Sequence, residues 1–483
     1  MTTHHYPQAH PLPIFGELGY RSRPPLSPTS TAPADSTSAD APVYSDPTAT
    51  PDPTDFSVGH PSDNSTYAQI GELLKKQVVD VPASRAADGD LYPLETVFGQ
   101  NGAAVTAAIR QAGKIVFHAV GDTGASDVRK YKGELRAADQ MSLDARTSDT
   151  ADQPKFFFHL GDVVYNFGEA AYYYDQFYEP YRAYPGPIIA IPGNHDSFVV
   201  PGTPAGQEPL TTFQRQFDNP DIVVTAEAGS LHRTATTAPG VYFALDAPFV
   251  RIIGLFSNAL EDPGVISSES GRWNISDRQL AFLAAQLARV KTEGYKGAVV
   301  LAVHHPPFTY ATPPRTGSLT GNHGSSTDML RDIDTVCAAA GIYPHAVFSA
   351  HAHNYQRYTR TINLAGNMIE VPFVVCGSGG HNINPLVRGS KQNPAPEPGF
   401  GTDVSYLEVR PAVQTTGLVL ERYDDVNYGY LRVTATPATL EIAFHQVSSQ
   451  GLAQSRYDLV TIDLAQHRLA ANSSAVARDA LTR

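Results

Sequence analysis

The sequence is poor in cysteine, in long hydrophobic runs and in basic residues. Only Cys337 and Cys376 occur among 483 residues, and they are not spaced as a zinc or redox pair, so a disulfide framework is excluded. No window approaches the run of about 20 apolar residues that spans a bilayer, so we expect no membrane partner. Residues 1–15 lack the basic and then apolar stretch of a secretory signal, which makes the cytoplasm the expected location.

The charge balance is acidic, with a net charge of -13 and a pI near 5.7. Proteins that bind nucleic acid through its phosphates usually carry a basic face, so nucleic acid is not an expected partner. Clustered carboxylates around cations would be compatible with this acidity. The hydrophobic fraction of 42% indicates a globular chain with a sizeable core, while the number of domains and the oligomeric state stay open.

Four segments differ in amino-acid composition and hydrophobic pattern. Residues 1–65 are rich in Pro, Ser and Thr and are predicted to be disordered, and the histidines near their start receive no role. Residues 66–112 are predicted to be helical before the breaker Gly113, from apolar positions at Ile70, Leu73, Leu74, Val105, Ala108 and Ile109. We expect a catalytic domain over 113–465 and a C-terminal tail over 466–483.

Within the catalytic domain, five short apolar runs each end in a polar cluster. Such runs are typical of buried parallel strands, and they cover residues 114–120, 156–160, 188–191, 298–303 and 346–349. Ligand sites in open α/β sheets gather at the carboxyl ends of strands. We therefore expect the five clusters to converge in space.

Other patterns predict the surrounding elements. Residues 249–256 are predicted to form a further strand, followed by a helix that begins at Ser276 with a capping box to Gln279. Its buried stripe is expected at Leu280, Leu283, Leu287 and Val290. Residues 430–435 and 440–444 alternate as half-buried strands and are expected to extend a second sheet packed on the first.

The first two clusters are ambiguous when taken alone. Asp122, in Gly121-Asp122-Thr123-Gly124, could cap the following turn. Asp162 and Tyr165, in Gly161-Asp162-Val163-Val164-Tyr165, place a carboxylate and a phenol at a strand end, although the phenol could pack among the aromatic residues of 172–184.

The remaining clusters are more specific. The amide oxygen of Asn194 suits a hard cation, and His195 beside it could donate a proton. His304 and His305 precede two prolines that end a strand, and one of these imidazoles is expected to bind metal. His351 and His353, two positions apart, point the same way in an extended segment. So many ligand types at successive strand ends are hard to assign to packing.

This order of clusters resembles the calcineurin-like metallophosphoesterase superfamily over about residues 114–444. A first motif ending in Gly124 instead of histidine, a tyrosine three residues after Asp162, and residues 351–357 are similar to its purple acid phosphatase branch. The resemblance implies an α/β fold, a four-layer α/β/β/α sandwich of two mixed sheets flanked by helices. Residues 1–112 show no strand pattern for the upstream β-sandwich domain of plant members.

The resemblance also implies a pair of divalent or mixed-valence metal ions, with iron, manganese and zinc as candidates. One ion would be held by Asp122, Asp162, Tyr165 and His353, and the other by Asp162, Asn194, His304 and His351. His195 would be the catalytic acid on the substrate side. His304 fits the family's His-x-Pro spacing, which leaves His305 as a neighbour that orients the loop or binds the substrate.

The expected function is hydrolysis of a small-molecule phosphate monoester by a water that the metal ions activate. A phosphodiesterase acting on nucleotides or lipids is the alternative within enzymes. A non-catalytic metal-binding scaffold is the alternative outside them, although a scaffold would usually have lost ligands. Residues 172–184 and 311–326 are the expected walls of the substrate site, and Gly321-Asn322-His323-Gly324 is interpreted as a surface loop bordering it.

Overall fold

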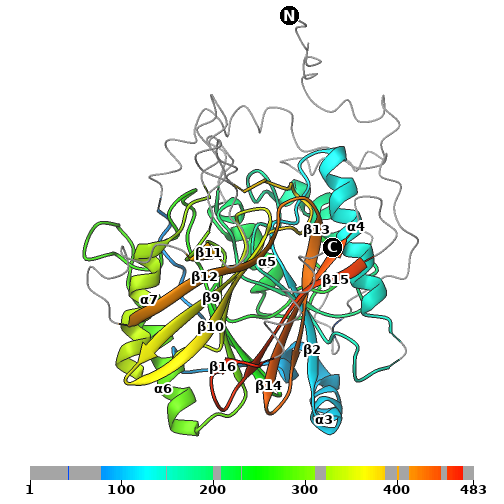
Figure 1. Ribbon diagram of the computed structural model, residues 1–483. Helices are drawn as coiled ribbons and strands as arrows, with labels where there is room; N and C mark the ends of the chain where they lie inside the picture. Colours follow the sequence, from blue (N-terminus) through cyan, green and yellow to red (C-terminus); the bar gives the residue numbers. More distant parts are fainter. Residues whose placement is uncertain are drawn as a thin grey trace, which may run out of the picture.

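Two mixed β-sheets form the centre of the fold in the computed structural model (Figure 1). The structure describes residues 42, 78–147, 149–198, 208–229, 231–309, 323–386, 400–401, 413–447 and 454–471. Apart from residue 42, the segment predicted to be disordered lies outside the described residues, as do Ile70, Leu73 and Leu74 of the first helical pattern.

The larger sheet, sheet A, has the strand order β1-β5-β6-β7-β8-β10-β9-β12-β11. Its strands are β1 (Tyr92–Pro93), β5 (Phe243–Ala247), β6 (Val250–Leu255), β7 (Ala298–Val303), β8 (Ala346–Ser349), β9 (Tyr355–Leu364), β10 (Asn367–Cys376), β11 (Phe400–Gly401) and β12 (Gln414–Asp424). Sheet B has the order β16-β15-β14-β13-β2-β3-β4. Its strands are β2 (Ile115–Val120), β3 (Phe157–His159), β4 (Ile188–Ala190), β13 (Tyr428–Ala435), β14 (Thr439–Val447), β15 (Gln454–Asp463) and β16 (Arg468–Leu469).

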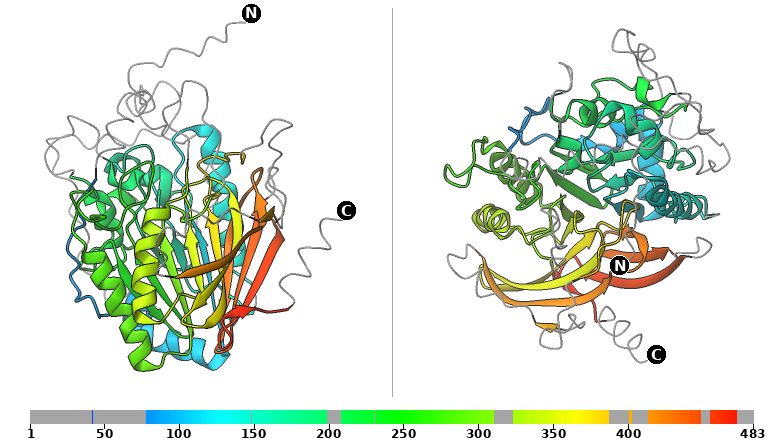
Figure 2. Two further views of the ribbon diagram at one scale, coloured as in Figure 1. Left: turned by 60° about the vertical axis from the view of Figure 1, so that its left-hand side comes forward. Right: turned by 90° about the horizontal axis from the view of Figure 1, so that it is seen from above.

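Helices cover the outer faces of the two sheets (Figure 2). The α-helices are α2 (Leu94–Val97), α3 (Gly102–Ala112), α4 (Val128–Asp144), α5 (Thr211–Phe217), α6 (Arg278–Glu293) and α7 (Thr327–Ala340). Helices α6 and α7 pack together beside sheet A, while α4 packs on β13 and β14 of sheet B. The expected α/β sandwich of two mixed sheets with flanking helices is confirmed. Among the described residues, no helix combines the length and hydropathy needed to cross a membrane.

The five apolar runs form β2, β3, β4, β7 and β8, as predicted. Strands β2, β3 and β4 pair in parallel in sheet B, and β7 and β8 pair in parallel in sheet A. Strands β13 and β14 extend a second sheet, as expected, but that sheet also contains β2, β3 and β4, because β13 pairs directly with β2. The site-bearing strands are thus divided between the two sheets, a division that depends on pairing between residues more than 300 positions apart.

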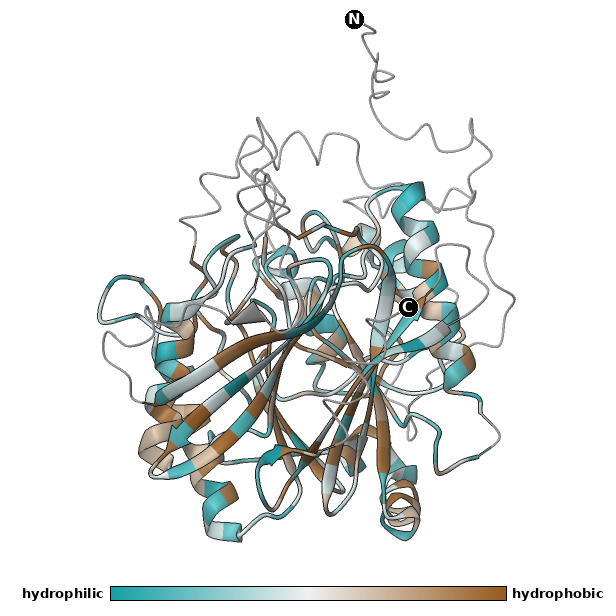
Figure 3. Cartoon of the chain, viewed as in Figure 1, coloured by the Kyte–Doolittle hydropathy of each residue, from teal (hydrophilic) through white to brown (hydrophobic). Residues whose placement is uncertain are grey.

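The hydropathy of the elements explains their placement (Figure 3). Strands β2, β6 and β7 are buried along their whole length, since each is covered on both faces. Helix α3 ends at Gly113, whose φ of 69° lies in the left-handed region, so the predicted helix stop is confirmed. Strand β16 pairs with β15, so sheet B continues into the segment expected as a C-terminal tail.

Helix α6 buries Phe282, Leu283, Leu287 and Val290 much as expected, with Leu280 only partly buried. Its predicted capping box is wrong. The helix begins at Arg278, and the buried amide of Gln279 instead exchanges two hydrogen bonds of 2.8 Å with the backbone of Phe256. The backbone N–H and C=O groups of Phe256, just after β6, therefore form hydrogen bonds with the Gln279 side chain, which is then not available to cap the helix.

Candidate metal centre

The predicted ligands follow the carboxyl ends of the five parallel strands within a few residues. Four of them have positive φ in turns: Asp122 at 56°, Asp162 at 57°, His351 at 65° and His353 at 48°. Left-handed backbone is uncommon for residues other than glycine and concentrates at functional sites. The sharp turns direct these side chains from two different sheets toward one interior region.

One set of donors surrounds the phenol of Tyr165. Its hydroxyl lies 2.9 Å from Oδ1 of Asp122 and 2.8 Å from Oδ2 of Asp162. Nε2 of His353 lies 3.2 Å from the same hydroxyl and 3.3 Å from Oδ1 of Asp122. All four side chains are buried, and we call them the first ligand group.

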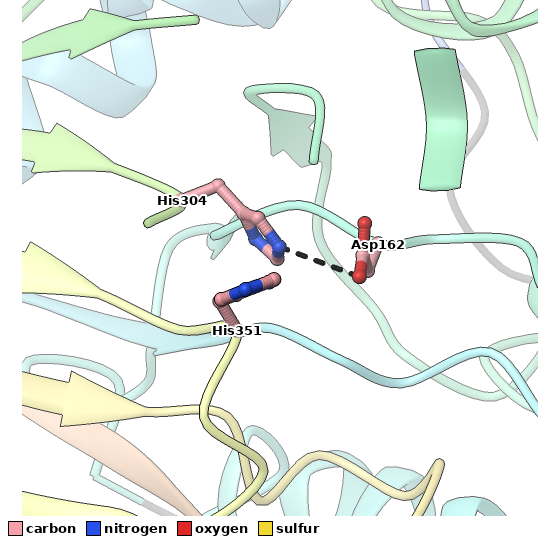
Figure 4. Close-up of side chains that lie close together, drawn as sticks. All are labelled: Asp162, His304 and His351. Carbon is pink, nitrogen blue, oxygen red and sulfur yellow. Dashed lines mark ion pairs between the residues drawn. The ribbon is translucent and has the colours of Figure 1, made fainter. Parts of the chain in front are cut away.

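A second set lies on the other side of Asp162. Nε2 of His304 lies 3.3 Å from Oδ2 of Asp162 (Figure 4). The same nitrogen lies 3.1 Å from Oδ1 of Asn194. Nδ1 of His351 lies 3.1 Å from the same amide oxygen. These residues form the second ligand group, and Oδ2 of Asp162 is the atom that both groups share. Two overlapping sets of carboxylate and imidazole atoms, Asp122 with Asp162 and His353 and Asp162 with His304 and His351, are close enough to hold metal ions.

Neighbouring groups fix the orientation of the imidazoles in the second group. Nδ1 of His304 lies 2.8 Å from the carbonyl oxygen of Leu160, so it carries the proton and leaves Nε2 for the site. Nε2 of His351 donates in the same way to the carbonyl of Glu261 at 2.8 Å, which leaves its Nδ1. The amide nitrogen of Asn194 donates to the Glu261 carboxylate at 3.4 Å, which turns the amide oxygen toward the two imidazoles.

The electrostatics of the two carboxylates call for a positive charge between them. Burial raises the pKa of Asp122 to about 8, and the neighbouring Asp162 adds to this shift. Burial acts on Asp162 as well, but His304 and His195 hold its pKa well below the usual range. Against the effect of burial, the charge of Asp162 raises the pKa of His304 to about 9. A bound cation could take the place of that proton.

The remaining imidazoles favour the neutral form that binds metal. Burial lowers the pKa of His353 to about 3 and holds that of His351 well below its usual range. Carboxylate, phenol, amide and imidazole donors together suit iron, manganese or zinc better than calcium, which prefers oxygen alone. The residues present therefore fit a centre for transition-metal ions.

Asp196 holds the turn that carries Asp162. Its Oδ2 accepts the backbone amides of Asp162 at 2.8 Å and Gly193 at 2.9 Å, and its Oδ1 accepts those of Val163 and Val164. A Cβ at Gly193 would collide with the Asp162 carboxylate, so this position needs glycine. The motif Gly193-Asn194-His195-Asp196 thus supplies a support for the β3 turn as well as site residues.

His195 lies beside both ligand groups. Its Nδ1 donates to the carbonyl oxygen of Asn166 at 2.7 Å, and its ring centroid is 4.2 Å from that of Tyr165. Its backbone amide donates to Oδ1 of Asp162 at 2.9 Å. The residue predicted as the acid is therefore held next to the phenol and the shared carboxylate.

His305 does not face the place where a substrate would bind. Its Nδ1 lies 2.8 Å from Oγ of Ser257, and its Nε2 donates to the carbonyl oxygen of Leu260 at 2.8 Å. Both ring nitrogens are engaged inside the protein, and the ring packs 4.3 Å from that of His351. Of the two predicted roles, substrate binding does not agree with this geometry, while loop positioning does.

His323 was interpreted as part of a surface loop bordering the substrate site; it lies beside the ligand groups, but its side chain is not at the surface. The side chain is buried, and its ring lies 4.6 Å from His351 of the second group and 4.9 Å from His353 of the first. Its Nε2 lies 4.0 Å from the Glu261 carboxylate, and its Nδ1 has no hydrogen-bond partner among the described residues. Residues 311–322 of the predicted wall 311–326 lie outside the described residues.

The other predicted wall, residues 172–184, is also corrected. Tyr173, Tyr178, Tyr181 and Tyr184 are buried in the main hydrophobic core, a placement that does not agree with a substrate wall. The segment instead supports Tyr165 through Gln176, whose side chain accepts the backbone amide of Tyr165 at 2.9 Å and donates to its carbonyl at 2.6 Å.

Three more residues near the first ligand group were not predicted from the sequence, namely His381, Lys130 and Asn384. The side-chain nitrogen of Asn384 lies 3.3 Å from Nδ1 of His353. The ring of His381 stacks on Tyr165, and Lys130 contacts His381. A Gly-Ser-Gly-Gly stretch before His381, directly after an apolar run, was the available sequence signal.

Taken together, the fold and the site define a metal-dependent hydrolase built on an α/β sandwich, with its ligands at the strand ends of both sheets. Residues 115–355 match the family model described as calcineurin-like phosphoesterase. The chain thus carries a calcineurin-like phosphoesterase domain, and it belongs to that superfamily of phosphoric ester hydrolases.

Solved structures show only distant similarity. One, described as "Structure of PhoD", has a TM-score of 0.41 and 15% identity, covering 81% of this chain and 73% of that chain. Another, "GAP50 the anchor in the inner membrane complex of Plasmodium", has a TM-score of 0.43 and 10% identity, covering 77% of this chain and 95% of that chain. No curated protein matches the sequence. These similarities are too low to bear on the substrate.

Proposed function

We propose that the protein is a binuclear metal-dependent phosphomonoesterase of the purple acid phosphatase-like branch. The observation that carries this proposal is the position of Oδ2 of Asp162, which lies 2.8 Å from the phenol oxygen of Tyr165 and 3.3 Å from Nε2 of His304. A carboxylate oxygen placed between two complete sets of donors is suited to bridging a pair of cations.

In this proposal, the two ligand groups hold one ion each. Asp122, Asp162, Tyr165 and His353 hold the first, and Asp162, Asn194, His304 and His351 hold the second. Iron, manganese or zinc would suit these donors. When bound, such ions lower the pKa of water to near neutrality and offset negative charge on the phosphoryl oxygens. The tyrosine in the first group favours the purple acid phosphatase-like branch.

Two imidazoles outside the ligand groups would act on the substrate. His195 lies beside Tyr165 and would protonate the leaving alkoxide, because its Nδ1 is held by the Asn166 carbonyl and its ring is fixed in place. His323 packs on the rings of His351 and His353, one from each group, and would donate to a phosphoryl oxygen. Glu261 is close enough to His323 to orient it.

Metal content and turnover, measured on one sample, test this function. The protein would be purified without chelator, its metals determined by elemental analysis, and its turnover compared on p-nitrophenyl phosphate and bis-p-nitrophenyl phosphate. We expect about two ions per chain and preference for the monoester. The variant Asp162→Asn should lose both ions, whereas Tyr165→Phe should weaken binding of the first ion and Asn194→Ala binding of the second.

The other outcomes separate the rival functions. Preference for the diester would replace the monoesterase by a phosphodiesterase with the same metal centre. Bound metal without turnover on either compound would indicate a scaffold. A protein that binds no metal after reconstitution with iron, manganese or zinc would contradict the proposal altogether.

A further inference from the structure

The segment after β10 is attached to two of the three turns that carry the first ligand group, the turns of Asp122 and His353. Its backbone amides donate to three carbonyl oxygens of those turns: Gly379 to Gly121 at 3.1 Å, His381 to Asp122 at 2.9 Å, and Asn384 to His353 at 3.0 Å. A Cβ at Gly377 would collide with the Asp122 carboxylate, so the segment approaches the ligands as closely as a backbone can. The donors Gly379, His381 and Asn384 do not themselves belong to either ligand group.

His381 presents its ring to Tyr165. The two ring centroids are 3.5 Å apart with an angle of 22° between the planes, and the imidazole is buried. Stacking at this distance restricts the tilt of the phenol, whose hydroxyl must reach Asp122, Asp162 and His353 together.

The hydrogen bonds of His381 determine its tautomer. Nδ1 lies 2.6 Å from the carbonyl oxygen of Gly124, which can only accept, so Nδ1 carries the proton. Nε2 of the neutral ring then accepts from the ammonium group of Lys130 at 2.7 Å. Lys130 also donates to Oγ of Ser126 at 3.0 Å, which holds the ammonium at the first turn of α4. Both edges of the imidazole are thus fixed.

The glycine at position 124 is part of the same arrangement. A Cβ there would collide with the carbonyl oxygen of Val163, one residue beyond Asp162, so a larger side chain would separate the first turn from the second. With glycine, the two turns close together and the Gly124 carbonyl is directed at His381.

We propose that His381 and Lys130 are positioning residues for the first metal ion, with His381 fixing the ring of Tyr165 and Lys130 fixing His381. This inference rests on the proposed function, because it assigns Tyr165 to the metal centre. Supports of this kind usually change metal affinity by about 10- to 100-fold when they are removed. Neither residue needs to contact the substrate.

The test is Co²⁺ binding to the metal-depleted full chain, followed by visible absorption, which reports the ligand geometry around each ion. The variants are His381→Phe, which keeps a stackable ring without its hydrogen bonds, and Lys130→Met, which keeps the stem without the charge. Lys132→Met, an exposed lysine on the same helix, is the matched control. Tyr165→Phe shows what loss of the ligand itself does.

We expect both variants to lower the affinity for the first Co²⁺ by about tenfold or more and to shift its absorption in the direction seen with Tyr165→Phe. The affinity for the second Co²⁺ should stay unchanged in both variants, and Lys132→Met should bind both ions as the wild type does. The double variant should bind the first Co²⁺ no more weakly than His381→Phe alone, since Lys130 acts through the imidazole. If His381→Phe does not fold, as judged by thermal unfolding without metal, Lys130→Met still decides the question.

Wild-type affinity and spectrum in Lys130→Met and His381→Phe would overturn the inference while leaving the proposed function intact. Additive losses in the double variant would overturn the order of action, since Lys130 would then act by itself. Failure of the wild-type chain to bind Co²⁺, or an unchanged first site in Tyr165→Phe, would instead contradict the proposed function on which the inference rests.

Discussion

His195 is the residue whose role is most separable from metal binding. It is held by the Asn166 carbonyl and does not belong to either ligand group. We expect His195→Ala to keep its metal content and to lose about 10²- to 10⁴-fold in kcat, as removal of an acid catalyst does. Steady-state kinetics and elemental analysis of the same preparation check this. Full activity in the variant would remove His195 from the mechanism.

A single carboxylate also decides the shape of a turn. Asp196→Ala would leave four backbone amides of the β3 and β4 turns without their acceptor, so we expect a loss of about 3 kcal/mol or more in unfolding free energy together with weaker metal binding. Ser197→Ala, which removes one hydrogen bond to Gly193 in the same loop, is the control and should cost about 1 kcal/mol. Urea unfolding and metal titration measure both effects. Normal metal affinity in Asp196→Ala would contradict the support role.

At the scale of an element, α4 carries a buried carboxyl group, Glu134, that makes its docking sensitive to pH. Glu134 is completely buried, and burial raises its pKa well above the usual value of 4.5, with only partial relief from the backbone amide of Ala125. The folded chain therefore binds this proton more tightly than the unfolded chain. Stability should be lost as pH rises above about 4.5, by up to about 1.4 kcal/mol per pH unit, until the folded pKa is reached.

Glu134→Gln removes this titration while keeping the shape of the side chain. The unfolding free energy of the variant should rise relative to that of the wild type as pH increases above about 5, because the unfolded glutamate ionises there before the folded one does. Thermal unfolding across that range measures the gain, with the exposed Glu95→Gln as control. A difference in stability between Glu134→Gln and the wild type that does not change with pH would contradict a raised pKa for the Glu134 carboxyl.

At the scale of the whole molecule, a buried ion pair joins the two sheets. Arg357 on β9 of sheet A binds Asp458 on β15 of sheet B at 2.7 Å and 3.1 Å, and the hydroxyl of Tyr355 donates to the same carboxylate at 2.7 Å. Arg357→Met would leave the charge of Asp458 buried without its cation, so we expect a loss of about 3–5 kcal/mol.

The companion variant distinguishes a stranded charge from lost packing. Adding Asp458→Asn to Arg357→Met removes the charge but still accepts from Tyr355, so much of the stability should return. Breaking the exposed pair with Arg331→Met, next to Asp328 on α7, should cost less than about 1 kcal/mol. Urea unfolding compares the three. No recovery in the double variant would mean that packing of Arg357, and not its charge, holds the sheets together.

The sequence by itself determined which strands carry the site and which side chains follow them. Asp122, Asp162 and Asn194 come directly after apolar runs that became β2, β3 and β4, and His304 and His351 follow β7 and β8. These features are local, because burial on both faces requires an unbroken apolar run and a sharp turn after it requires glycine or a short polar residue. Ligand order along the chain could therefore be read without coordinates.

Only the tertiary structure decided how these strands share two sheets, why Tyr173 and its neighbouring tyrosines lie in the core, and which distant residues support the ligands. His323 comes from a loop without periodic pattern, and His381 meets Lys130 across 251 positions. Such contacts depend on strand pairing and packing between remote segments, and a local pattern contains no record of them. The polarity of a buried residue predicts that it will form a hydrogen bond, but only the tertiary fold determines with which residue.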